Sequence, residues 1–218
     1  MSSFKVPVVL DYYTDIQSDS YHRYKSWEHC YLEFSRERDV DKLSLHLAFY
    51  LASWGMYRGS SGLLQKDYKI HYNAVKIILN PKYDSIRAFD ADVSRQDIPL
   101  ILTLIKELQD YYENVPFVRN KKPDKITATD TLISKIILGA TGSIPAYDRY
   151  FNIGLQQYGI TQKIGNKSLN QLFDFMEDGD NLSLIEKAQE EITSGELIYP
   201  KMKILDMFFW SEGFNKKK

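Results

Sequence analysis

The stretch 133-ISKIILGATGSIPAYDRYF-151 decides how this chain is interpreted, because it holds the clearest break between two amphipathic segments. The apolar residues before the break repeat at helical spacing, and Gly139 stands where that helix is expected to end. Gly142 supplies a second residue suited to positive φ, and Pro145 fixes the direction of the chain. Asp148 can then accept hydrogen bonds from the free amides of the next helix. The stretch therefore predicts a corner between two helices.

Helical spacing also dominates the rest of the chain. The apolar positions of 41–54 and 94–112 recur at three and four residues. Asp39 or Asp41 can cap the first segment, and Ser94 with Asp97 has the spacing of a capping box at the start of the second. Alternation of period two is scarce, and the N-terminal run 6-VPVVL-10 is too short to build a sheet. The fold class is therefore predicted to be all-α, with about nine helices. They are expected at 19–36, 41–54, 61–79, 94–112, 127–138, 149–158, 167–177, 182–193 and 200–212.

The chain has 218 residues, which suits one compact domain. Its most polar connector, 119-RNKKPDK-125, lies between two strongly helical segments. We expect this connector to join two helical lobes, residues 1–118 and 119–218, with a cleft between them. No internal repeat and no low-complexity linker divides the chain further.

The composition restricts the classes of function. The chain is 44% hydrophobic and carries 28 basic and 29 acidic side chains, for a net charge of −1. This balance does not favour a general nucleic-acid binder, although a local basic patch stays open. Cys30 is the single cysteine, so an intramolecular disulfide and a multi-cysteine zinc site are excluded. The N-terminal apolar run is too short for a signal peptide or a membrane span, so we expect a cytoplasmic protein.

Histidine spacing gives no metal site. His22 and His29 are seven residues apart, or about 10 Å along a helix, which is too far for one metal ion to bridge. His46 and His71 are open as general bases, although a satisfied, partly buried histidine is the commoner case. Cys30 follows His29 directly, and neighbouring side chains on a helix point about 100° apart, so the two do not form a thiolate–imidazole pair.

The glycine turn has a dinucleotide-binding alternative. The run IILGATGSI resembles the start of the extended short-chain dehydrogenase fingerprint, in which a strand enters a glycine turn below a helix. Pro145 occupies the third glycine position, and no alternating series of strands and helices surrounds the motif. We therefore predict no nucleotide cofactor.

The same corner, SKIILGATGSIPAYDRYF, resembles the corresponding segment of helix-hairpin-helix DNA glycosylases in the order helix, glycine, proline and aspartate. The resemblance extends in outline over about the last hundred residues. It implies that Asp148 faces the sugar of a flipped nucleotide in duplex DNA and stabilises the positive charge of bond cleavage. The chain departs from the family at 121-KKPDKITATD-130, which lacks the glycine-containing hairpin turn. No lysine nucleophile is identifiable, so the resemblance implies a monofunctional enzyme that uses water.

Further site residues follow from this hypothesis. Aromatic faces are needed to hold the flipped base, and the glycine-rich turn 53–62 is a candidate wall of the cleft or an anion site. The predicted substrate-binding residues are Tyr147, Trp54, Tyr57 and Arg58, with the three aromatic rings as stacking surfaces and Arg58 as the anion contact of the turn. Positive charge is needed for the DNA phosphates. The predicted phosphate-binding residues are Arg119, Lys121, Lys122, Lys125 and Arg149.

Two other functions stay open at this point. The 16 tyrosines and the balanced net charge favour a non-enzymatic helical module that presents a tyrosine-rich surface to a partner protein. The turn 53–62 also allows an enzyme that binds a phosphate-bearing ligand. In both cases Asp148 would serve only as a helix cap.

Overall fold

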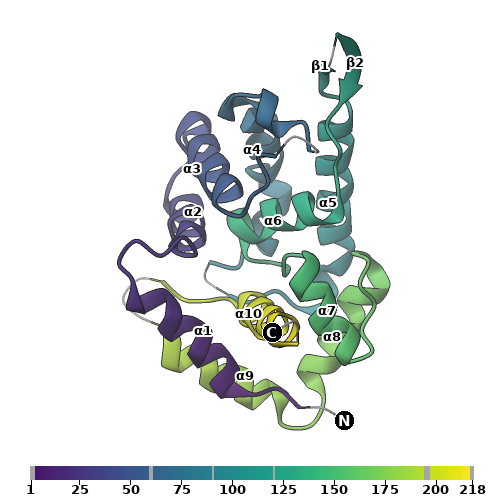
Figure 1. Cartoon of the computed structure of the whole chain (residues 1–218). Helices are drawn as coiled ribbons and strands as arrows, with labels where there is room; N and C mark the ends of the chain where they lie inside the picture. Colours follow the sequence, from purple (N-terminus) through teal and green to yellow (C-terminus); the bar gives the residue numbers. More distant parts are fainter. Residues whose placement is uncertain (1–2, 59–60, 90, 120, 194–196, 217–218) are drawn as a thin grey trace.

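The structure is a computed structural model that describes residues 3–58, 61–89, 91–119, 121–193 and 197–216, with only the backbone of residue 119 (Figure 1). These residues form ten α-helices and one two-stranded sheet, so the predicted all-α class is confirmed. The helices are α1 (Val6–Ser18), α2 (Lys25–Arg36), α3 (Val40–Ser53), α4 (Tyr72–Ile78), α5 (Ile98–Glu113), α6 (Asp130–Thr141), α7 (Arg149–Gln157), α8 (Asn166–Glu177), α9 (Asn181–Ile192) and α10 (Lys201–Asn215). The strands are β1 (Pro116–Arg119) and β2 (Lys122–Lys125).

Two helices form the interior of the molecule. Every residue of α6 from Leu132 to Thr141 is buried, and every residue of α10 from Met202 to Ser211 is buried. A helix that is surrounded on all sides needs apolar residues on all its faces, and both sequences largely meet this requirement. The charged residues inside these two helices are therefore exceptions, and they are described with the candidate site.

The helices gather around these two centres. In Figure 1, α2 to α6 form the upper group, while α1 and α7 to α10 form the lower group. α6 packs on α2, α3 and α5, whereas α10 packs on α1, α7 and α9. The two groups thus do not follow the expected division at 118–119, since α1 joins the C-terminal helices and α6 joins the N-terminal ones. One continuous hydrophobic core runs through both groups.

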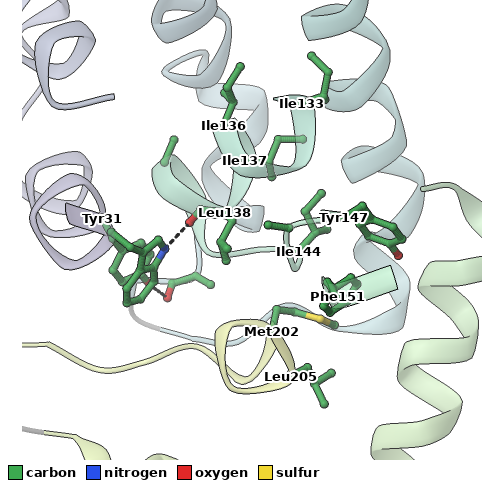
Figure 2. Close-up of a cluster of buried hydrophobic side chains, with 14 of the residues drawn as sticks. Tyr31, Ile133, Ile136, Ile137, Leu138, Ile144, Tyr147, Phe151, Met202 and Leu205 are labelled. Carbon is green, nitrogen blue, oxygen red and sulfur yellow. Dashed lines mark hydrogen bonds between the residues drawn. The ribbon is translucent and has the colours of Figure 1, made fainter. Parts of the chain in front are cut away.

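The corner between α6 and α7 begins later than predicted. The helix continues through Gly139 to Thr141, and Gly142, with φ of 69°, terminates it. Gly139 serves packing instead, because a Cβ there would lie 2.5 Å from the Tyr50 ring. Figure 2 shows apolar side chains from α6, α7 and α10 closing around the corner. Among them are Ile133, Ile137, Phe151, Met202 and Leu205, and they pack with Ile144 of the corner itself.

The predicted helix starts are confirmed where local hydrogen bonding sets them. Asp39 caps α3 by accepting a hydrogen bond from the Lys42 amide at 2.9 Å. Ser94 and Asp97 form the capping box before α5. Asp148 caps α7 by accepting hydrogen bonds from two free amides of its first turn, each at 3.1 Å. Such caps satisfy amides that have no partner within the helix.

The N-terminal helix was not predicted. α1 begins with Pro7 in its first turn, where a missing amide hydrogen costs nothing, and it buries Val9, Tyr12 and Ile16. The predicted helix 19–36 shortens to α2, and residues 19–24 form turns. Of the predicted helix 61–79, only α4 is α-helical, preceded by short 3₁₀ turns.

The polar connector is a β-hairpin. Pro116 pairs with Lys125 and Arg119 pairs with Lys122 in antiparallel register. Residues 121–125 are exposed, while Phe117 is buried and holds the base of the hairpin. Figure 1 draws the hairpin beyond the end of α5, so it projects from the upper group and does not link the two groups.

Two glycines allow α7 and α10 to cross at unusually short range. A Cβ added at Gly154 would lie 1.9 Å from the backbone oxygen of Phe209, and one added at Gly213 would lie 1.9 Å from that of Tyr150. Backbone therefore meets backbone at this crossing, which fixes the orientation of α7 and of the carboxylate at its start. No helix of the described residues is long and apolar enough to cross a membrane.

Candidate functional site

An ion pair joins the two sides of the α6–α7 corner. The Lys135 ammonium, from the middle of α6, donates to Asp148 Oδ2 at 2.9 Å. Asp148 Oδ1 accepts the hydrogen bonds of the Tyr150 and Phe151 amides. The Lys135 side chain is 4% exposed and the Asp148 side chain is 15% exposed. The carboxylate is thus held by three donors and keeps a narrow opening to solvent.

Three stacked rings lie beside this pair. Tyr24 lies between the other two rings, with its centroid 5.3 Å from that of Tyr12 and 4.6 Å from that of Trp54. The ring planes in the two contacts differ by only 14° and 15°. The Lys135 ammonium lies 4.3 Å from the centre of the Trp54 ring, which is a favourable cation–π distance. We call Tyr12, Tyr24 and Trp54 the ring stack.

A second lysine–aspartate pair lies at the other end of the ring stack. Lys203 donates to Asp206 Oδ2 at 2.7 Å, and the two side chains are 3% and 7% exposed. The Lys203 ammonium lies 5.5 Å from the centre of the Tyr12 ring. Asp206 Oδ1 accepts from the Ala146 amide at 3.0 Å, two residues before Asp148. The second pair thus anchors the chain segment that presents Asp148.

The pKa of Tyr50 shows that the two lysine–aspartate pairs lie close to each other. Burial raises the pKa of Tyr50 well above its usual range, and the negative charges of Asp206 and Asp148 add to the rise. A phenol affected by both carboxylates lies within electrostatic reach of each. Residues from α3, α6, α7 and α10 therefore converge on one buried, charged and aromatic centre where the two helical groups meet.

Two buried polar atoms near this centre have no hydrogen-bond partner within the described part of the chain. They are Nε1 of Trp54 and Oδ1 of Asn152, one turn into α7. A buried donor without a partner costs about 1–3 kcal/mol, so such atoms are uncommon in folded proteins. The unpaired Nε1 donor belongs to the same Trp54 ring that contacts the Lys135 ammonium. Trp54 is therefore a candidate for contact with a ligand.

The structure brings only part of the predicted site together. Trp54 and Asp148 both contact Lys135, so Trp54 belongs to the same part of the structure as the carboxylate, and its role in base binding stays a prediction. Tyr147 does not fit, because its side chain is fully buried and its hydroxyl donates to Ser168 Oγ at 2.9 Å. Its predicted role as a base-stacking surface is wrong, since no face of the ring is open.

Tyr57 and Arg58 are not part of the site around Asp148. The Tyr57 hydroxyl forms a 2.8 Å hydrogen bond with His71 Nε2, and burial raises the pKa of Tyr57 to about 12. Arg58 is exposed, and no contact within the described residues joins either side chain to Asp148. Residues 59–60 of the turn 53–62 lie outside the described residues, so the anion-site hypothesis for that turn stays a prediction.

The predicted phosphate-binding residues are divided between two places. Lys121, Lys122 and Lys125 are exposed on the hairpin, which Figure 1 draws well away from α7. The side chain of residue 119 lies outside the described residues. Arg149 is exposed directly after Asp148. A further cation, Arg23, was not predicted; its guanidinium lies 5.0 Å from the centre of the Tyr24 ring and 5.7 Å from that of the Trp54 ring.

The most informative residues were not predicted from the sequence. Lys135 interrupts the apolar run ISKIIL, and Lys203 and Asp206 interrupt MKILDMFF at a spacing of three. Lysine and aspartate are almost never fully buried unless they are paired. A charged residue within a strongly apolar helix could therefore have predicted a buried ion pair. The sequence pattern does not show which residue of another segment is the partner.

His71 is a structural residue. It is fully buried between two tyrosines, with Nδ1 2.6 Å from the Tyr112 hydroxyl and Nε2 2.8 Å from the Tyr57 hydroxyl. Burial lowers the pKa of His71 to about 3. The neutral ring has one donor and one acceptor, which matches its two hydroxyl partners.

This burial predicts a pH-dependent stability. Between about pH 6.5 and pH 3 the unfolded chain binds a proton at His71 that the folded chain does not bind. The free energy of unfolding should therefore fall with decreasing pH in this window, by up to about 1.4 kcal/mol per pH unit from this group. Urea unfolding at a series of pH values measures the slope. His71→Gln should flatten it, and His29→Gln, at an exposed position, should not. Equal slopes in all three proteins would contradict this assignment.

Cys30 offers no nucleophile. It is fully buried, and this burial raises the pKa of its thiol well above the usual range. Within the described residues, no group of three or more His, Cys, Asp or Glu side chains is placed to hold a metal ion.

No family model, curated protein or solved structure matches this chain. The case for a function therefore depends on the geometry of the site.

Proposed function

We propose that the protein acts on duplex DNA as a monofunctional N-glycosylase that removes a damaged or modified base, with Asp148 as the sugar-facing carboxylate. The observation that carries the proposal is the partly open carboxylate of Asp148 beside the Lys135 ammonium and the Trp54 ring. A fixed negative charge in such a setting stabilises positive charge that develops on a sugar ring.

The reaction would proceed by hydrolysis. The bond between the base and C1′ of the sugar breaks, and its electron pair leaves with the base. Positive charge develops on the sugar, and a water oxygen then bonds to C1′ while a proton of that water passes to the departing base. Asp148 Oδ1 accepts from two amides and Oδ2 accepts from the Lys135 ammonium, so the developing charge would have to approach the part of Oδ2 that Lys135 leaves open. This geometry gives the carboxylate a fixed direction before substrate binds.

Lys135 would position the carboxylate rather than attack the sugar. Its ammonium is held by Asp148 Oδ2 and lies over the Trp54 ring. An ammonium in an ion pair has no free electron pair, so the attack is assigned to water. Borohydride reduction in the presence of substrate should therefore trap no covalent complex of protein and DNA.

Trp54 would contact the displaced base. A base must leave the helical stack to reach a buried carboxylate, and an aromatic face or an indole N–H can hold it outside. The Trp54 N–H lacks a partner among the described residues, and Tyr24 supports the ring from behind. A base acceptor at this N–H would remove the cost of the buried, unpaired donor.

The exposed cations would contact the phosphates. Arg149 follows Asp148, and Arg23 lies against the ring stack, so both are close to the carboxylate. The hairpin lysines Lys121, Lys122 and Lys125 lie farther away and would add charge contacts along the duplex. Contacts of this kind are independent of sequence and weaken as salt concentration rises.

The decisive experiment is base release by an Asp148→Asn variant. Duplexes that carry different damaged or modified bases are incubated with the protein, and abasic sites are detected by strand cleavage in alkali. Asparagine keeps the cap but removes the charge, so base release should fall by about 100-fold or more. Asp39→Asn is the control for the cap alone, because Asp39 accepts from an amide of α3 but has no buried lysine partner among the described residues. Far-UV circular dichroism establishes that Asp148→Asn, which leaves Lys135 unpaired, is still folded. Unchanged activity in Asp148→Asn, or no release from any duplex by the unaltered protein, would overturn the proposal.

A non-enzymatic interaction module is the alternative. Leu45 and Phe49 lie one turn apart on α3 and are 54% and 59% exposed, which is unusual for large apolar side chains. The bonds of Asp148 to its own helix and to Lys135 also match a purely structural cap. A protein that does not bind duplex DNA even at low salt would favour this alternative.

A further inference from the structure

The β1–β2 hairpin projects from the helical body as an arm (Figure 1). Its base is anchored, because Phe117 is buried and the Lys66 ammonium donates to the Pro116 carbonyl oxygen at 3.2 Å. A Cβ added at Gly62 would lie 2.9 Å from the Phe117 ring, so the chain before α4 packs directly on this anchor. Each strand has four residues and extends about 13 Å at about 3.3 Å per residue. The arm therefore has a defined direction with respect to the helices.

One face of the arm is apolar and points away from the helices. Val118 lies directly opposite Pro123 in the register, and residues opposite each other share a face of a hairpin. The next pair, Phe117 and Asp124, belongs to the other face, and Phe117 is buried against the body of the protein. Val118 is 66% exposed, and Pro123 is exposed as well. The outward face thus presents an apolar pair to solvent.

The arm also concentrates positive charge. Lys121, Lys122 and Lys125 are all exposed, and their ammonium groups form no ion pair or hydrogen bond within the described part of the chain. Lys125 lies opposite Pro116 and therefore shares the outward face. The whole chain has a net charge of −1, so this concentration does not follow from its composition. An apolar face bordered by ammonium groups is complementary to a polyanion that also offers apolar contacts.

A β-strand of another protein is a poor match for this arm. Pro123 has no amide hydrogen, and proline and lysine on an exposed strand oppose pairing with a further strand. The major groove of duplex DNA is a better match, because it is about 12 Å wide and admits a two-stranded ribbon, whereas the minor groove is about 6 Å wide. Thymine methyl groups in the major groove offer apolar contacts, and phosphates border the groove.

We propose that the hairpin lies in the major groove of duplex DNA. Val118 and Pro123 face the base edges, and the three lysines face the phosphates on either side. This inference rests on the duplex-DNA part of the proposed function but not on the chemistry of Asp148. Because the arm lies away from α7, it should contribute to the affinity for DNA and not to the rate of base release from bound DNA.

A triple substitution tests the phosphate contacts. The hairpin variant combines Lys121→Gln, Lys122→Gln and Lys125→Gln, and fluorescence anisotropy follows its binding to a labelled duplex between about 50 and 200 mM salt. Each lost phosphate contact lowers the slope of log K against log salt by about 0.9, so the slope should fall by about 2.7. The affinity at about 0.1 M salt should fall about tenfold or more. The control variant carries Lys76→Gln, Lys106→Gln and Lys187→Gln on exposed positions of three helices. It should bind nearly as the unaltered protein does.

Val118→Ser tests the apolar contact. The side chain is largely exposed, so the fold should be retained. The affinity should fall about fourfold, as expected for the loss of about one buried methyl group. The salt slope should not change, because no counterion is exchanged at an apolar contact. Leu45→Ser, at a similarly exposed position of α3, is the control and should leave the affinity unchanged. A Val118→Ser protein that binds as tightly as the original would contradict the contact with the base edges.

Competitors identify the groove and the partner. Methyl green, which occupies the major groove, should displace the protein, and netropsin, which occupies the minor groove, should not. The reverse result, or an unchanged salt slope in the hairpin variant, would remove the proposed arm. Binding of polyglutamate as tight as binding of the duplex at equal salt would also do so, because it would indicate an acidic protein partner.

Base release separates this inference from the proposed function. At saturating duplex the hairpin variant should release the base at the rate of the unaltered protein. Normal base release together with unchanged affinity in the hairpin variant would remove only the role of the arm. A complete lack of duplex binding by the unaltered protein would remove both proposals.

Discussion

Gly213→Ala should lower the free energy of unfolding by about 3 kcal/mol or more. A Cβ at this position would lie 1.9 Å from the backbone oxygen of Tyr150 and 2.8 Å from the amide nitrogen of Gly154. Backbone atoms cannot rotate away as a side chain can, so α7 and α10 would have to separate. Overpacking usually costs about 1–3 kcal/mol and sometimes more. Because this clash is between backbone atoms, we expect a cost above that range, about 4 kcal/mol, from which a gain of about 1 kcal/mol in helix propensity is subtracted. Thermal unfolding should show a melting temperature lower by about 6–12 °C.

Gly154→Ala should have a similar effect, because its Cβ would lie 1.9 Å from the Phe209 oxygen. The double substitution should cost less than the sum of the two single ones, since both force the same two helices apart. Gln156→Ala, at an exposed position of α7, is the control and should change stability by less than about 0.5 kcal/mol. A Gly213→Ala protein as stable as the original would show that this crossing is looser than the structure has it.

Lys203→Met should destabilise the protein by about 3–5 kcal/mol. Methionine keeps most of the packing volume, but the substitution leaves the Asp206 carboxylate buried without its cation. The side chains of the pair are 3% and 7% exposed, so water cannot replace the lost interaction. Urea unfolding measures the loss, and far-UV circular dichroism establishes that the helices remain.

A second substitution tests the cause of this loss. Asp206→Asn removes the unpaired charge and keeps an oxygen that can accept from the Ala146 amide. The double variant Lys203→Met with Asp206→Asn should therefore recover at least half of the stability lost in Lys203→Met, because a neutral buried pair avoids the cost of an isolated charge. If the double variant is no more stable than Lys203→Met alone, the loss comes mainly from weaker packing against Trp27 and Tyr12.

The two lysine–aspartate pairs also connect stability with the proposed chemistry. Asp206 holds the backbone at Ala146, and Asp148 follows two residues later. Loss of the deeper pair should therefore displace the carboxylate of Asp148 as well as weaken the fold. A displacement of about 1 Å at a reacting group is enough to reduce a rate by about 100-fold.

Features that depend on neighbours along the chain could be predicted from the amino-acid sequence alone. The helical class followed from apolar spacing, and the caps formed by Asp39 and Asp148 followed from the preference of their side chains for free amides. The corner before α7 was predicted for the same reason. These interactions span only a few residues, so a local pattern is sufficient to reveal them.

The meeting of distant residues became visible only in the folded chain. The fold placed Lys135 against Asp148 and Trp54, and it buried the Tyr147 ring. α6 also continues past Gly139, where the absence of a Cβ lets the helix pack closely on the Tyr50 ring. It also grouped α1 with the C-terminal helices. Each of these outcomes depends on how the faces of separate helices fit together in space. Residue spacing along one helix defines its buried face but does not specify the partner that covers it.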